Sequence, residues 1–357
     1  MGHSSANALA GGVFGSSTDD LSDLRELVDD IGRRAFDAAI GHRSLPDAFD
    51  STAWGRLEAT GLTRLTSTAD SGGGPIDAAV VLHALARHAV TVPLAETDLL
   101  ACWLAGVAGL PVPESGPLAI AVGSPGRPFE AVPYAANAAA IVFAVNDGDH
   151  LRVTVGTPDE VAITRGHNAG GEPRDTVIAD LAGTVAVGAD TAAELTRRGA
   201  WARCVQVIGA LDAAVEYSVS HTRGREQFGR SISDFQSVQH TLAGMAGEVD
   251  QARAAVHLAV DAAAEHGFIS RQADYAVTVA KVTLGRVAPS VVTAAHQLHG
   301  AIGTTIDHRL WLATQRARSW ISEFGDTASH AGKLGRMALA GDLWEMIVSG
   351  GAPSPSS

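Results

Sequence analysis

The most regular pattern of apolar residues in the chain lies between residues 235 and 263. Its members follow one another at alternating steps of three and four residues: Phe235, Val238, Leu242, Met245, Val249, Ala252, Val256, Ala259 and Ala263. This spacing predicts one long helix whose apolar stripe packs against a neighbouring helix. At a rise of 1.5 Å per residue, about 29 residues form a rod of roughly 40 Å. The pattern therefore favours a helical bundle around this segment.

Helical spacing also marks most of the remaining chain. The predicted helices span about 21–31, 49–62, 76–90, 191–220, 233–266, 271–299, a segment through Trp311, and 327–345. Helices of this kind pair by burying their apolar stripes. An up-and-down bundle is therefore the physical expectation for the second half of the chain.

A middle region has the pattern of strands instead. Short strands are predicted over 118–122, 140–145, 151–155, 161–163 and 176–178. The sequence Asn-Asp-Gly-Asp at 146–149 predicts a tight turn between the second and the third of these strands. We therefore expect a mostly helical α+β fold, with a helical N-terminal domain (1–112), a small β middle domain (113–187), a C-terminal bundle of the four-helix type (188–350) and a disordered tail (351–357).

Composition excludes several classes of function. The formal net charge is −13, and the chain has no basic run, which argues against a nucleic-acid-binding protein. Cys102 and Cys204 lack metal-like or redox spacing, so we expect a reduced, cytoplasmic setting. No apolar run reaches the roughly 18 residues of a membrane span. His296 and His299 have no third ligand close in sequence, so no metal site is expected.

Two short segments carry the chemistry. Arg225, Phe228 and Gly229 form an Arg-x-x-Phe-Gly segment before the long helix. About seventy residues later, Gln297 begins a Gln-x-x-Gly-Ala-x-Gly segment whose two glycines are Gly300 and Gly303. A guanidinium can grip a phosphate in bidentate fashion, and glycine lets a ligand approach the backbone closely. The glycines also suit a helix C-cap and turn, and both roles can hold together.

The order and spacing of these segments resemble the acyl-CoA dehydrogenase family. The resemblance implies that family's architecture, in which a helical domain, a middle β-barrel and a helical bundle follow one another. It also implies FAD as cofactor and an acyl-CoA thioester as substrate. In this family, the two segments reach an FAD that is held mainly by a neighbouring subunit. The residues that would contact the cofactor are Arg225, Gln227, Phe228, Gln236, Gln297, Gly300 and Ala301.

The middle region departs from the family pattern. The family's first middle strand leads into a Thr-Glu-Pro-x-x-Gly-Ser-Asp loop that contacts the flavin, whereas residues 121–128 of this chain lack it. The family's Trp-Ile-Thr contact has no counterpart near 132–134. This chain's own pocket for a flavin ring is therefore in doubt.

The catalytic carboxylate of the family is missing at both of its usual places. One place lies 26 residues before the arginine of the first segment, which is Gly199 here. The other precedes the glycine of a Tyr-Glu-Gly-Thr-like loop, and aligning that glycine with Gly325 places Phe324 there. A general base must ionise near neutral pH, and neither residue can. Glu323 is the candidate substitute, with a solvated loop carboxylate as its alternative interpretation, and Glu194 is a second nearby acid.

The resemblance and its departures together predict one half of a heteromeric acyl-CoA dehydrogenase. A full-length partner, in an α2β2 assembly, would hold the flavin ring and supply the base, as in actinobacterial enzymes for steroid side-chain thioesters. The alternatives are a self-sufficient homo-oligomer that uses Glu323 and a non-catalytic scaffold that binds no flavin.

Overall fold

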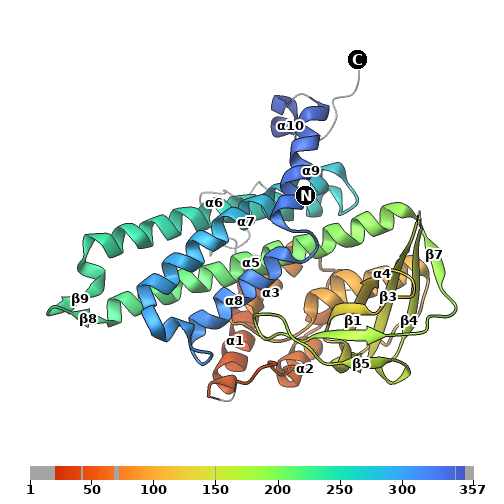
Figure 1. Ribbon diagram of the computed structural model, residues 1–357, viewed down its shortest axis with the longest axis horizontal. Coiled ribbons are helices and arrows are strands. Elements are labelled where there is room, and N and C mark those ends of the chain that lie inside the picture. The colour runs from red at the N-terminus through yellow and green to blue at the C-terminus, as the bar shows by residue number, and fades with distance from the viewer. Residues whose placement is uncertain (1–20, 42, 68–71, 149, 342, 350–357) are drawn as a thin grey trace.

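The computed structural model describes residues 21–349 except 42, 68–71, 149 and 342, and the predicted disordered tail at 351–357 lies outside the described residues. Helices come first, a β layer follows, and long helices complete the chain (Figure 1). This order confirms the predicted mostly helical α+β fold. The domain boundaries at 112 and 187 stay a prediction.

Short helical segments precede the first strand: α1 (Ser22–Ala39), α2 (Ser51–Ala59), η4 (Leu62–Arg64), α3 (Pro75–Arg87), η5 (Glu96–Cys102) and α4 (Trp103–Ala108). The carboxylate of Asp50 accepts a hydrogen bond from the backbone N–H of Ala53 at 2.8 Å and so caps α2. The segment η5 is a π-helix that is buried throughout. The sequence pattern does not predict it, because Glu96 and Asp98 interrupt its apolar residues.

Two small sheets form the β layer. The first has the order β1 (Leu118–Gly123), β3 (Ala140–Asp147), β4 (His150–Gly156), β7 (Val185–Val187), and the second has the order β2 (Phe129–Pro133), β6 (Arg174–Ile178), β5 (Ala162–Thr164). β1 and β3 are parallel, and the other pairs are antiparallel. Ala119 and Ile141 pack with the core between the sheets, whereas Ile120 and Val142 pack with the helical core. Burial on both faces explains why these strands are continuous apolar runs.

The second half of the chain is built on three long helices: α5 (Ala189–Gly224), α6 (Gln236–His266) and α7 (Arg271–His299). A hairpin of β8 (Glu226–Gln227) and β9 (Arg230–Ser231), followed by η8 (Ile232–Asp234), joins α5 to α6 at the left end of Figure 1. After α7 come η9 (Gly300–Thr304), α8 (Arg309–Ser322), α9 (Thr327–Ala340) and α10 (Leu343–Ser349).

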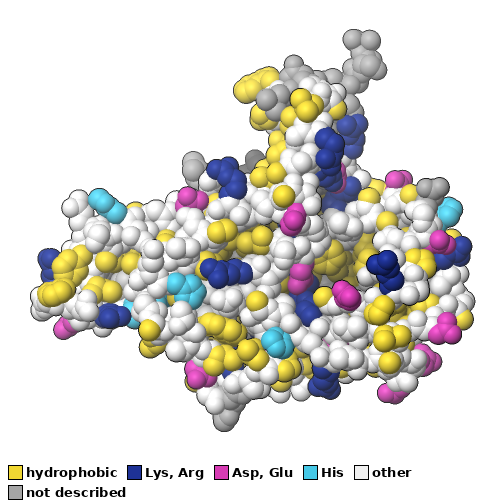
Figure 2. Space-filling model, in the orientation of Figure 1, with side chains coloured by type: hydrophobic (Ala, Val, Ile, Leu, Met, Phe, Trp, Pro, Cys, Tyr) yellow, Lys and Arg dark blue, Asp and Glu magenta, His cyan; other side chains and the backbone are white. Residues whose placement is uncertain are grey.

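The apolar stripe on α6 is buried from Met245 onward, whereas Val238 and Leu242 near the start of the helix are half-buried. Met245, Val249, Ala252 and Val256 are at most 2% exposed, and α6 packs along α7. The final helix differs from the prediction of one element over about 327–345. It ends at Ala340 because Gly341 takes an extended conformation, and α10 is separate. Hydrophobic side chains gather on the arm formed by α9 and α10 (Figure 2).

Candidate functional site

The segment between α5 and α6 forms a tight, exposed hairpin. Gln227 pairs with Arg230, and the backbone N–H of Ile232 donates to the carbonyl of Arg225 at 2.8 Å. The tip residues Phe228 and Gly229 have φ angles of +54° and +77°. That conformation is easy for glycine but uncommon for phenylalanine. The hairpin thereby presents the Phe228 ring, which is 90% exposed, at the end of the bundle.

The second predicted segment lies at the same end. α7 ends at His299, and the residue that caps it, Gly300, has a φ of +67°, which favours glycine. Gln297, Gly300 and Ala301 line a shallow hollow of about 490 Å³. Arg225 Nη1 donates to the backbone carbonyl of His299 at 3.5 Å. The fold therefore brings the two segments together, although about seventy residues separate them.

The side chains at this end fit the elongated anionic cofactor that the resemblance implies. Arg225 is exposed, and within the described ranges no ion pair joins it to a carboxylate, so its guanidinium donors are available to a phosphate. A Cβ at Gly300 would meet no atom within 4 Å, so the backbone there is open to a ligand. The amides of Gln227, Gln236 and Gln297 are exposed and can donate and accept. Their contacts with a cofactor stay a prediction.

Gly303 has a different role from Gly300. Gly303 is buried, and a Cβ on it would lie 2.9 Å from both the Cβ of His299 and a methyl group of Leu310. Glycine is therefore required at 303 by packing between the end of α7 and α8. The proposed close approach of a cofactor to this glycine is not needed to explain it.

Gly199 and Phe324, the two positions that the resemblance aligns with the family's base, are in direct contact. A Cβ built on Gly199 would lie 2.3 Å from Cδ1 of Phe324, so the phenylalanine ring rests on the bare backbone of α5. Phe324 has a φ of +56°, an uncommon conformation for a bulky residue. The glycine and the phenylalanine complement each other, and their contact occupies the space where a carboxylate would project.

Glu323 is the centre of an ion-pair network. One carboxylate oxygen accepts from Arg174 Nη2 at 2.8 Å, and the other accepts from Arg203 Nε at 2.6 Å. Burial would raise the pKa of Glu323, but the charges of Arg203 and Arg174 outweigh burial and lower it to about 2. The interpretation as a solvated loop carboxylate is therefore wrong. A carboxylate with this pKa is also a poor proton acceptor near neutral pH.

The network joins several elements. Arg203 on α5 donates through Nη2 to Glu96 of η5 at 2.6 Å, and both side chains are 2% exposed. Lys281 Nζ on α7 donates to the backbone carbonyls of Ile321 and Glu323 at 2.6 and 2.8 Å, which fixes the loop that carries Glu323. These contacts hold the loop that carries Glu323 firmly against α5 and α7.

Sequence reasoning missed Arg174, Arg203 and Glu96, because their partners are distant in sequence. One signal was present: Arg203 is the single charged residue in the stretch 199–211, where an isolated charge needs a partner. Glu194, the second candidate acid, pairs with Arg198 on the same helix at 2.8 Å. It does not join the network around Glu323.

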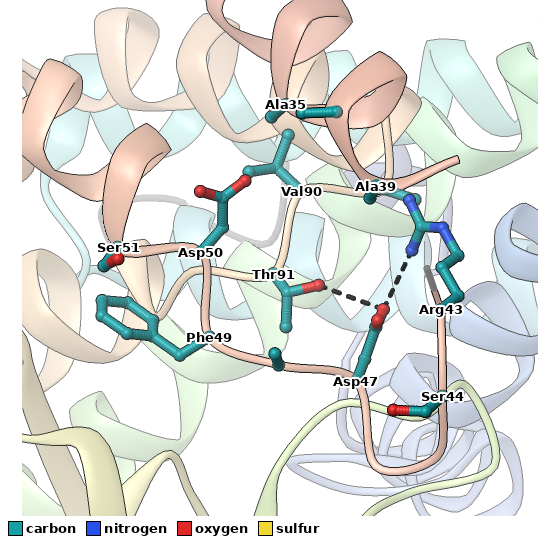
Figure 3. Close-up of a pocket in the computed structure, with 13 residues that line it drawn as sticks. Ala35, Ala39, Arg43, Ser44, Asp47, Phe49, Asp50, Ser51, Val90 and Thr91 are labelled. Atoms are coloured by element: carbon teal, nitrogen blue, oxygen red, sulfur yellow. Dashed lines mark hydrogen bonds and ion pairs between the residues drawn. The ribbon is translucent and has the colours of Figure 1, made fainter. Parts of the chain in front are cut away.

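A second hollow, of about 290 Å³, lies between the end of α1 and the segment before α2 (Figure 3). Asp47 is its hub and accepts from Arg43 Nη1 at 3.0 Å, from Thr91 Oγ1 at 3.2 Å and from Arg316 Nη2 at 3.0 Å. The carboxylate of Asp47 is already paired with Arg43 and Arg316, so we assign the cluster a structural role. It links the segment between α1 and α2 to α8.

No helix in the described part of the chain is both long and apolar enough to cross a membrane. Within the same ranges, no group of three or more His, Cys, Asp or Glu side chains is arranged to hold a metal ion.

Comparison with known proteins gives these features a family context. Residues 187–338 match the model of the acyl-CoA dehydrogenase C-terminal domain. The acyl-CoA dehydrogenase IpdE2 of Mycolicibacterium smegmatis is 26% identical over 319 residues, which cover 83% of this chain and 93% of that protein. The alignment therefore spans nearly the whole length of IpdE2.

Solved structures share the fold. The ChsE4–ChsE5 complex of Mycobacterium tuberculosis contains a chain with a TM-score of 0.78 and 22% identity, covering 91% of this chain and 99% of that one. The steroid acyl-CoA dehydrogenase Tcur3481–Tcur3483 gives a TM-score of 0.75 with 22% identity, again covering 91% and 99%. Residues 187–338 thus match the acyl-CoA dehydrogenase C-terminal domain, and the chain shares its fold with a solved acyl-CoA dehydrogenase.

Proposed function

We propose that this chain is one subunit of a heteromeric flavin-dependent acyl-CoA dehydrogenase. It completes the FAD site of a full-length partner subunit, and that partner carries the catalytic base. The assembly, an α2β2 tetramer in the cytoplasm, introduces an α,β double bond into an acyl-CoA thioester. Two structural relatives are named as pairs of gene products, and one is described as a steroid enzyme, which favours a steroid- or lipid-derived acyl group.

The observation that carries the proposal is the contact between Gly199 and Phe324. Either position would have to bear a carboxylate for this chain to remove an α proton by the family's route. Instead, the Phe324 ring lies against Gly199, and the neighbouring Glu323 is held by Arg174 and Arg203. This arrangement supports a proton acceptor that comes from another subunit.

This chain contributes to the reaction through the exposed residues at the end of the bundle, which we call the cofactor clamp: Arg225, Gln227, Phe228, Gln236, Gln297, Gly300 and Ala301. FAD, when bound, supplies the acceptor for the β hydride. Arg225 would hold the cofactor's pyrophosphate, because a guanidinium binds phosphate oxygens through parallel hydrogen bonds. The amides of Gln227, Gln236 and Gln297 would bond its polar groups, and Phe228 would offer an apolar ring. Gly300 and Ala301 would border it with little side-chain bulk.

The environments of Glu323 and Arg225 disfavour the two alternative functions, a homo-oligomer and a scaffold. A self-sufficient homo-oligomer needs Glu323 as base, and a pKa of about 2 counts against that role. A scaffold without flavin gives no reason for an exposed, unpaired Arg225 beside an open Gly300.

The visible spectrum of the purified protein tests the proposal. The chain is purified alone and after co-expression with a full-length dehydrogenase subunit. A flavin band that depends on the partner supports the heteromer. A band from the chain alone supports the homo-oligomer, and no band in either preparation supports the scaffold.

A further inference from the structure

Three histidine rings from three elements meet beside Arg225. His221 lies in the last turn of α5, His299 ends α7, and His308 precedes α8. The His221 and His299 rings are stacked, with centroids 4.4 Å apart and planes at 22°. His308 meets the His299 ring edge to face at 5.2 Å. The carbonyl of His299 also accepts from Arg225, so the stack adjoins the predicted phosphate-binding guanidinium.

The three rings differ in their freedom to take up a proton. His299 Nδ1 faces the carbonyl of Ala295 at 2.8 Å, so this nitrogen carries the hydrogen. His308 Nδ1 accepts from the backbone N–H of Leu310 at 3.2 Å, so a proton there would cost a helix cap. In the described part of the chain, Nε2 of His221 and Nε2 of His299 are both buried without a hydrogen-bond partner, but His299 is only 1% exposed whereas His221 is half-buried and so nearer to solvent. His221 can therefore change its protonation state without losing a hydrogen bond.

The charges around the stack favour a neutral ring until an anion arrives. Burial, then His299, Arg225 and His308, lower the pKa of His221 below its ordinary value. The same direction holds for His299, for His308, which faces Arg309, and for His296, which faces Arg318. Arg309 itself pairs with Asp37 of α1 at 3.2 Å. Among the described residues, the charged side chains that act on these rings are thus cations, and no carboxylate offsets them.

We propose that His221 is a protonatable part of the pyrophosphate site, which takes up a proton when the cofactor binds. This inference rests on the proposed function. The pyrophosphate of FAD carries two negative charges, of which Arg225 matches one, and a protonated His221 supplies the second positive charge. The neutral His299 ring beneath it stabilises the imidazolium through a cation–π contact.

Proton uptake makes FAD affinity depend on pH in a defined direction. Unliganded His221 is neutral near pH 7, and a bound anion raises its pKa, so binding adds a proton. Affinity should therefore increase as the pH falls from about 8 to about 6, by up to about tenfold per pH unit where uptake approaches one proton. FAD suits the test, because none of its own groups titrates in this range.

Calorimetry on the flavin-free complex with its partner subunit tests the proposal. FAD is titrated at about pH 7 in two buffers of different ionisation enthalpy, and Kd is measured from about pH 6 to about pH 8. The wild type should take up protons, and His221→Asn should not. His221→Phe keeps a stacking ring that cannot be protonated, so it should bind FAD with a flat pH profile. The matched control, His240→Asn on the exposed start of α6, should retain the wild-type profile.

Two results would overturn the inference: no proton uptake by the wild type, or an unchanged pH slope in both folded His221 variants. Binding of FAD without proton uptake would overturn this inference and leave the proposed function standing. A complex that binds no FAD at any pH would overturn both.

Discussion

Replacing Glu323 by glutamine removes the central charge of the ion-pair network and keeps the shape of the side chain. The folded pKa of about 2 lies below the ordinary value of 4.5. At about 1.4 kcal/mol per pKa unit, this shift corresponds to roughly 3 kcal/mol of stability. Because the folded pKa is depressed, the stabilisation is present above about pH 4.5 and is lost as the pH falls toward 2. At neutral pH, Glu323→Gln should therefore lower the free energy of unfolding by roughly 3 kcal/mol and the melting temperature by roughly 4 °C.

Thermal melting and a dye-reduction assay with an acyl-CoA substrate, both on the complex, measure the two consequences of Glu323→Gln separately. The rate per bound flavin should stay near that of the wild type, since the proposed function places the base on the partner. Glu194→Gln is the matched control, because Glu194 also pairs with an arginine on α5 but has a single partner, and it should lower stability less. Wild-type melting of Glu323→Gln would refute the network's role. A hundredfold loss of rate at full flavin occupancy would refute the heteromer and identify Glu323 as the base, since loss of a general base costs about two to four orders of magnitude.

Three further substitutions test the cofactor clamp, the packing of α6 in the bundle and the contact between Gly199 and Phe324. Arg225→Ala should weaken FAD binding by roughly ten- to hundredfold, because a charge-assisted hydrogen bond is worth about 1.5–3 kcal/mol; unchanged flavin content at low FAD would contradict its role. Val249→Asp should prevent soluble expression, since it buries an unpaired carboxylate in the contact between α6 and its neighbours; normal melting would mean that this face is exposed. Gly199→Ala should destabilise the fold by forcing the Phe324 ring aside, and adding Phe324→Ala should restore part of the loss in a denaturant titration. Purely additive effects would show that the two residues do not touch.

The sequence was sufficient for features that depend on local periodicity. The alternating apolar positions from Met245 to Ala263 identified a buried helix, and the run 140–145 identified a strand covered on both faces. Long-range pairing has no such periodicity. Glu96 lies 107 residues before Arg203, and Arg174 lies 149 before Glu323, so nothing local indicates that these charges meet. The buried π-helix η5 escaped prediction for the same reason, because its carboxylates are explained only by distant partners.

The sequence predicted only the part of the candidate site that lies in recognisable motifs. Arg225 and Gln297 stood out because their motifs have a recognisable order, and the fold brings their segments to one end of the bundle. The stack of His221 and His299 did not stand out, because lone histidines have many ordinary roles and their contact depends on how α5 and α7 end. Gly303 was assigned to the cofactor, whereas its packing against Leu310 is visible only in three dimensions.

The network around Glu323 has a consequence for how the protein can be divided. Glu96 comes from the N-terminal helices, Arg174 from the β layer, and Arg203 from the bundle. A fragment that holds only the bundle would keep Arg203 and Glu323 but lose the partners on the other two layers. Because uncompensated buried charges are costly, such a fragment would not retain the native core. The three layers should consequently unfold in one cooperative transition rather than as independent units.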